Sequence, residues 1–140
     1  MAEKTDYLPD TNTILRYLLD DHPDLSSKAR IFWEEVRQGK RKAILTEGVL
    51  MECVYVLQRF YKVPRKETAA NLKRLLAYKG VDQTNVGLFE AALIIYEEHS
   101  LDFVDCLLIA GNRQGQGVVF SFGEKINRLM SKPNGEPSPQ

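Results

Sequence analysis

Three carboxylates stand alone beside apolar residues, and they constrain the fold of this chain more than any other feature. Glu52 and Asp105 each interrupt an otherwise apolar helical run, and Asp10 directly follows the short apolar run 7–9. A helix that is apolar on nearly all sides is expected to be buried, and a buried carboxylate costs several kcal/mol unless a cation or hydrogen bonds compensate it. Three such residues in 140 predict a shared compensating partner.

Helical and extended patterns alternate along the chain. Apolar periodicity, capping residues and glycine or proline stops predict helices over residues 11–19, 25–38, 47–61, 65–78, 87–99, 102–114 and 124–130. Short apolar runs predict strands at 7–9 and 42–46 and a buried strand at 117–121. This alternation is typical of an α/β domain with a parallel sheet covered by helices on both faces. We expect one domain over residues 1–132 and a disordered tail over 133–140.

The composition limits the function classes. With 19 basic and 19 acidic side chains the formal net charge is zero, so binding of nucleic acid would depend on local patches rather than bulk charge. No apolar run is long enough to cross a bilayer and the first residues lack a secretory signal, so we expect a cytoplasmic protein without a membrane partner. Two cysteines, Cys53 and Cys106, are too few for a disulfide scaffold.

The predicted topology brings the three acids to one edge of the sheet. Asp10 follows the first strand, and Glu52 lies in the first turns of the helix after the second strand. Asp105 lies in the first turn of a helix that leads into the last strand. Ligands of open α/β sheets bind at the carboxyl edge. Carboxylate oxygens suit Mg²⁺ or Mn²⁺ better than zinc, because His22 and His99 form no ligand pair with the cysteines.

Each acid also has a structural interpretation. Asp10 has the position of a helix cap, and Glu52 shares a helical face with Gly48 and Arg59 that could be a solvated seam. Asp102 and Asp105 have the spacing of a cap followed by a stabilising anion in the first turn. The metal site accounts for all three acids at once, whereas these interpretations account for them one at a time.

The chain resembles a PIN domain of the VapC toxin type over about residues 7–129. The resemblance depends on the order and spacing of four segments: residues 8–15, 45–57, 101–110 and 118–122. It implies a three-layer α/β/α fold with a short parallel sheet. It further implies a metal-dependent endoribonuclease, usually a homodimer, that acts as a toxin and is silenced by an antitoxin protein. The three family acids fall on Asp10, Glu52 and Asp105, with Asn12 and Ser121 at two supporting polar positions.

One position departs from the family pattern. Gly123 stands where the family often has a fourth acid, and Glu124 or Asp102 would have to supply that charge instead. The departure favours one tightly held metal ion over a two-metal site, and it also allows reduced or lost activity. We expect the metal to be held by Asp10 and Asp105, with Glu52 completing the cluster through a water or acting as general base.

Basic side chains offer a path for the substrate backbone. The candidates for RNA binding are Lys62, Arg65, Lys66, Lys73 and Arg74, or else the run Lys40–Lys42, although ordinary solvated surfaces also explain them.

Two other functions compete with the nuclease. One is a catalytically impaired PIN-like module that binds RNA or protein. The other is a haloacid-dehalogenase-like phosphatase, whose motif is similar to residues 10–13 but has an aspartate where this chain has Asn12.

Overall fold

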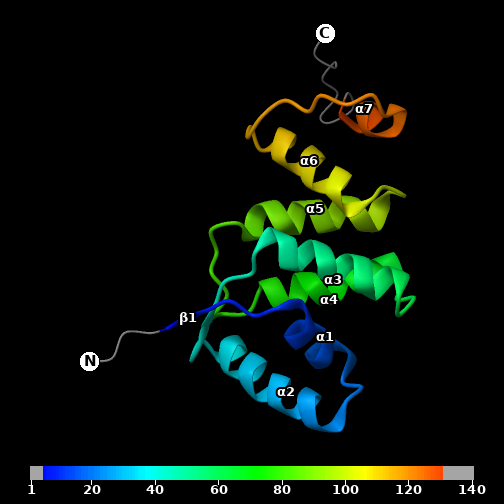
Figure 1. The fold of residues 1–140 in the computed structure, drawn as a ribbon. Coiled ribbons are helices and arrows are strands. Elements are labelled where there is room, and N and C mark those ends of the chain that lie inside the picture. The colour runs from blue at the N-terminus through cyan, green and yellow to red at the C-terminus, as the bar shows by residue number, and fades with distance from the viewer. Residues whose placement is uncertain (1–4, 131–140) are drawn as a thin grey trace. The chain divides into compact units, whose positions relative to one another are not determined.

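The computed structural model describes residues 5–130 (Figure 1), and these divide along the chain into two compact units, one up to Val86 and one from Gly87. The first unit contains β1 (Asp6–Tyr7), α1 (Thr11–Leu19), α2 (Pro23–Gln38), β2 (Lys42–Ala43), α3 (Glu47–Arg59) and α4 (Arg65–Leu76). The second contains α5 (Val86–Glu98, whose first residue ends the first unit), α6 (Phe103–Arg113) and α7 (Glu124–Met130). All seven predicted helices are present, with ends within two residues of the prediction. The predicted tail over 133–140 lies outside the described residues, and the single domain over 1–132 stays a prediction.

The first unit is built on a small parallel sheet. Tyr7 of β1 lies opposite Ala43 of β2, and the amide of Ile44 donates to the Tyr7 carbonyl at 2.9 Å. Parallel strands need a long crossover, and α1 with α2 supplies it between β1 and β2. The parallel sheet and the α/β class are therefore confirmed.

Val81 adds a one-residue rung to this sheet that the sequence does not predict. The Ala43 amide donates to the carbonyl of Gly80 at 2.9 Å, and the Asp82 amide donates to the Ala43 carbonyl at 2.8 Å. Gly80 makes this pairing possible, because a Cβ there would lie 2.0 Å from the carbonyl oxygen of Arg41. Helices α3 and α4 form the crossover from β2 to this rung.

Helices of the first unit share an apolar core. In Figure 1, α1 packs against α2 and α3, and α3 packs against α4. Trp33 of α2, Leu50 and Leu57 of α3, and Leu72 of α4 are all at most 2% exposed. Burial of such side chains is worth about 1.5–3 kcal/mol each, so this core holds α1 and α3, which carry the candidate site, in fixed positions.

In the part of the chain that the structure describes, the second unit consists of helices α5, α6 and α7 and the segments that join them. The rings of Tyr96 in α5 and Phe103 in α6 meet edge to face at 5.9 Å, and α7 packs against α6. Within residues 5–130, none of the helices combines the length and apolar character that crossing a bilayer requires.

The predicted buried strand at 117–121 is wrong in this structure. These residues form no ladder, and the large apolar side chains at and just beyond them are exposed: Val118 by 78%, Phe120 by 87% and Phe122 by 92%. Local bonds take the place of ladder bonds here. The Val119 amide donates to the Asn112 side chain at 3.3 Å, and the amide after Phe122 donates to the Ser121 hydroxyl at 3.0 Å.

Candidate active site

The carboxyl edge of the small sheet is where the first two candidate acids lie. Because β1 and β2 are parallel, both strands end at the same edge, and helices α1 and α3 begin just beyond it. Asp10 is the N-cap of α1, and Thr46 is the N-cap of α3 through a bond from the Val49 amide. Two helix N-termini, with their partial positive charge, therefore flank this edge.

Asp10 is an ionised helix cap. Its Oδ1 accepts a hydrogen bond from the Thr13 hydroxyl at 2.7 Å and another from the Thr13 amide at 2.9 Å. These bonds, the hydroxyl's first, lower the pKa of the Asp10 carboxyl below its ordinary value. The cap interpretation of Asp10 is thus confirmed. Both bonds with Thr13 end on Oδ1, so the cap fixes the carboxylate through one of its two oxygens.

Glu52 reaches the start of α1 from the second turn of α3. The Thr11 hydroxyl, next in sequence to Asp10, donates to Glu52 Oε1 at 2.5 Å. Both carboxylates also act on the buried thiol of Cys53. Its pKa is raised to about 12, first by burial and then by the negative charges of Glu52 and Asp10. The fold therefore brings Asp10 and Glu52 together at the carboxyl edge of the sheet.

The expected burial of these acids is wrong. Asp10 and Glu52 are exposed and Asp105 is half-buried. Helix α3 buries one face through residues such as Leu50, Cys53 and Leu57, and it leaves the face of Glu52 in solvent. An apolar run is therefore compatible with a solvated seam on one side, as the alternative interpretation of Glu52 proposed.

The third acid lies in the second unit. Asp105 is in the first turn of α6, and within residues 5–130 its side chain makes no hydrogen bond or ion pair. Asp102 occupies the N-cap of α6 but makes no capping bond with its side chain, so the cap interpretation holds for its position only. No group of three or more His, Cys, Asp or Glu in the described part of the chain is arranged to hold a metal ion. That Asp105 joins Asp10 and Glu52 stays a prediction.

The supporting positions are distributed over both units. Asn12 is exposed in the first turn of α1. Half-buried Ser121 accepts the Gly123 amide with its hydroxyl and the Asn127 side chain with its carbonyl, and Glu124 is the exposed first residue of α7. A Cβ at Gly123 would lie 3.2 Å from the side chain of Ile126, so a larger residue there needs only a small shift.

The basic candidates divide by exposure. Lys62, Lys66 and Arg74 are exposed, and Arg74 donates to Asn71 at 3.1 Å; Arg65 and Lys73 are half-buried. Lys62 follows the end of α3 with a positive φ of 56°, and the other four belong to α4. All five lie within or just before one helix of the first unit, and whether they bind RNA stays a prediction.

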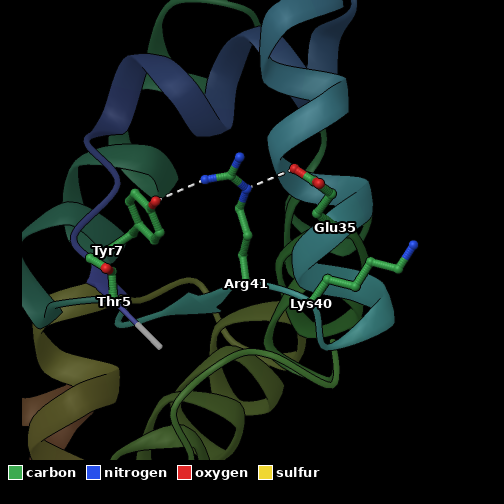
Figure 2. A pocket seen from close by; sticks show the side chains of 5 residues that line it. All are labelled: Thr5, Tyr7, Glu35, Lys40 and Arg41. Atoms are coloured by element: carbon green, nitrogen blue, oxygen red, sulfur yellow. Dashed lines mark hydrogen bonds and ion pairs between the residues drawn. The ribbon is translucent and has the colours of Figure 1, made fainter. Parts of the chain in front are cut away.

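The run Lys40–Lys42 lies at the opposite edge of the sheet from Asp10. It precedes or begins β2, so it marks the amino edge, beside a cavity of about 230 Å³. Figure 2 shows the Arg41 guanidinium between the Tyr7 hydroxyl at 2.9 Å and the Glu35 carboxylate at 2.7 Å, while Lys40 points away from both. The hydrogen bond with Glu35 raises the pKa of Arg41 further, so this cation is already engaged within the fold. Its position argues against a role beside the carboxylates.

The fold is that of a PIN domain. The family model described as "PIN domain" matches residues 7–131, and the chain belongs to this family. It is similar to a VapC ribonuclease of Aquifex aeolicus (strain VF5), with 26% identity over 126 residues that cover 89% of this chain and 93% of the relative. No solved structure matches the chain significantly.

The donor set of this site fits a hard divalent cation. Asp10 is ionised at neutral pH, as its hydrogen bonds from Thr13 lower an already acidic pKa, and the exposure of Asp10 and Glu52 leaves both accessible to an ion from solvent. Oxygen ligands of this kind are what Mg²⁺ and Mn²⁺ prefer, usually together with several waters. The two residues present therefore suit the metal that the family implies.

Proposed function

We propose that this chain is a metal-dependent endoribonuclease that hydrolyses phosphodiester bonds of RNA. The observation that carries the proposal is the hydrogen bond from Thr11 to Glu52, which holds Glu52 beside Asp10 at the carboxyl edge of the sheet. The ribonuclease relative over most of the chain supports the same activity. Asp105, at the third acid position of the family, is proposed as the remaining member of the site.

In this mechanism the residues of the chain have separate tasks. Asp10 and Asp105 would hold Mg²⁺ or Mn²⁺, and Glu52 would complete the cluster through a water or act as general base toward the attacking water. When bound, such an ion supplies Lewis acidity toward a phosphate oxygen and lowers the pKa of water. The capping bonds from Thr13 hold the Asp10 carboxylate in place, and they favour its ionised form.

The proposed biological role is that of a toxin in a toxin–antitoxin pair, acting in the cytoplasm. The relative is named a VapC ribonuclease, and the family resemblance implies a toxin that an antitoxin protein would keep silent. We further propose a homodimer, as the family resemblance implies. The basic residues Lys62, Arg65, Lys66, Lys73 and Arg74 are proposed to guide the RNA backbone, supported by their location in one part of the first unit.

Cleavage of RNA by the purified chain tests the activity. We expect cleavage with Mg²⁺ or Mn²⁺, none with EDTA, and a loss of at least about 100-fold for Asp105→Asn, since a metal ligand is removed. Asp24→Asn is the matched control, because Asp24 is also in the first turn of a helix, α2, and belongs to no proposed site. Equal loss in both variants would contradict a specific role for Asp105.

The impaired binding module remains a second candidate because of Gly123. If the missing fourth acid limits activity, Gly123→Asp should raise cleavage, and the 3.2 Å approach to Ile126 shows that the new side chain needs only a small adjustment. RNA binding without cleavage by the wild type under any metal, and without gain in Gly123→Asp, would favour the module over the nuclease.

A further inference from the structure

A groove runs along the solvent face of α3, directly beside the proposed catalytic carboxylate. It has a volume of about 680 Å³ and is lined by Met51, Glu52, Tyr55, Val56, Arg59 and Phe60, with Gly48 at the start of the helix. This volume is in the range of small-ligand clefts, about 300–1,000 Å³. Glu52 is the member of this groove to which a task has already been assigned.

Tyr55 and Arg59 follow Glu52 on the same helical face. They are three and seven positions further along α3, so they rise about 4.5 Å and about 10 Å along the helix axis from Glu52. The Arg59 guanidinium lies over the Tyr55 ring at 5.7 Å from its centroid, and Tyr55 is still 53% exposed. One aromatic ring therefore stands in solvent, one helical turn from the carboxylate, with a cation beside it.

Neither residue is explained by the folding of the first unit. Within residues 5–130, Arg59 makes no ion pair with a carboxylate, so its charge stays available. A third residue of the groove, Phe60 at its end, is 79% exposed. An aromatic ring exposed to this degree adds little to the stability of the fold, so folding does not explain it either. Exposed aromatics next to unpaired cations are the combination that binds single-stranded nucleic acid, through base stacking and phosphate contacts.

We propose that Tyr55 is a stacking platform for one unpaired base of the RNA substrate and that Arg59 binds an adjacent phosphate. This inference rests on the proposed ribonuclease function and names the residues that position its substrate beside Glu52. A second copy of this chain is the competing occupant. The groove favours RNA because of Glu52: glutamate is depleted in the cores of protein interfaces, whereas an RNA cleaved at the proposed site has to lie beside this carboxylate.

Binding and cleavage are measured separately. Affinity for a short fluorescein-labelled oligouridylate is measured in EDTA, where no cleavage is expected, and cleavage of an unstructured RNA is measured in Mg²⁺. We expect Tyr55→Leu to weaken binding about 5- to 100-fold and to raise KM more than it lowers kcat, because stacking on one base is lost. Tyr55→Phe keeps the ring and should bind within about twofold of the wild type.

The phosphate contact has its own readout. Arg59→Gln should reduce the slope of log affinity against log salt concentration by about 0.7, the value for one phosphate contact on a single strand. Lys28→Gln, which removes an exposed charge on α2 outside the groove, should leave this slope unchanged. Equal slopes for Arg59→Gln and Lys28→Gln would overturn the assignment of Arg59.

A fluorescence signal tests the stacking directly. Trp33 is the chain's one tryptophan and is fully buried, so Tyr55→Trp adds a single exposed indole. We expect oligouridylate to quench this new emission but not that of Trp33 in the wild type. Unchanged emission on saturation with oligouridylate would contradict a base stacked at this position.

The outcomes separate the two proposals. Oligouridylate binding that depends on Tyr55, without cleavage in any metal, supports the platform and overturns the nuclease. Cleavage with normal KM and normal binding in Tyr55→Leu overturns the platform and leaves the nuclease intact. A shift of Tyr55→Leu from dimer to monomer in sedimentation, with RNA binding unchanged, overturns the platform in favour of an interface between two copies.

Discussion

Substitution of Asp10 separates its capping role from its proposed metal-binding role. Asn is about as good an N-cap as Asp, because its side-chain oxygen also accepts the bond from the Thr13 amide, but it carries no charge. Asp10→Asn should therefore keep most of the stability of the fold and lose cleavage. Asp10→Ala removes the cap as well, so it should lose both.

The structure sets the size of each effect. Loss of an N-cap costs about 0.5–2 kcal/mol, and for a chain of 140 residues about 1 kcal/mol lowers Tm by roughly 4 °C. We therefore expect Asp10→Ala to unfold about 2–8 °C earlier, and Asp10→Asn to unfold within about 2 °C of the wild type. Trp33 fluorescence is a suitable probe, since Trp33 is buried in α2, which packs against the helix that Asp10 caps.

The charge of Asp10 makes the stability of the fold depend on pH in a defined direction. The pKa of Asp10 is lowered in the folded chain, so the ionised carboxylate stabilises the fold above the unfolded value of about 3.8. This contribution is lost as the pH falls through the lower, folded pKa. The stability advantage of the wild type over Asp10→Asn should therefore be constant near neutral pH and decline below about pH 4.

Metal binding provides a readout that does not depend on cleavage. A ligand present at 100 times its Kd stabilises the folded state by about 2.7 kcal/mol, so saturating Mn²⁺ should raise the Tm of the wild type by several degrees. Asp10→Asn should lose most of this increase. If Asp10→Asn kept both the Mn²⁺ stabilisation and the cleavage, Asp10 would be a helix cap only, and its role as ligand would be refuted.

Three further predictions test the fold itself. Gly80→Ala should destabilise the chain by about 3 kcal/mol or more in urea unfolding, since its methyl group would lie 2.0 Å from a backbone oxygen, whereas Gly48→Ala, with open space around it, should be neutral or stabilising. Cys53 should resist iodoacetamide at pH 8 in the native chain and react in urea, because burial raises its thiol pKa to about 12; rapid native labelling, followed by mass spectrometry, would contradict this. Phe120→Ser should change the free energy of unfolding by no more than about 0.5 kcal/mol, since the side chain is 87% exposed; a loss above about 3 kcal/mol would instead support the buried strand that the sequence predicts.

Local features of the sequence were sufficient for the helices. The helix over Thr11–Leu19 is predicted at its observed bounds, because Asp10 signals its start and its apolar spacing has the helical period. The rung at Val81 could not be predicted in this way. It consists of one residue, and it depends on how closely Gly80 approaches Arg41, a contact between segments that are far apart in sequence.

Whether a residue of α3 is buried depends on the face of the helix on which it lies more than on how apolar the surrounding sequence is. Tyr55 and Phe60 extend the apolar character of the run around Glu52, yet both are exposed, since only one face of α3 meets the core. The same reason explains the error at 117–121, where Val118 and Phe120 have the composition of a buried strand without backbone partners in the structure. Composition states what a segment can bury, whereas the packing partners decide what it does bury.

The candidate site shows the same division between local and long-range information. The sequence identifies Asp10 and Glu52 as unusual acids, but Thr11, which connects them, has no distinguishing pattern of its own. Thr11 is 9% exposed, and its hydroxyl reaches Glu52 across 41 positions of sequence only because α1 packs against α3. Packing of these two helices therefore positions both carboxylates before any metal binds, so Thr11→Val, which removes the hydroxyl, would leave Glu52 without that anchor while sparing the Asp10 cap.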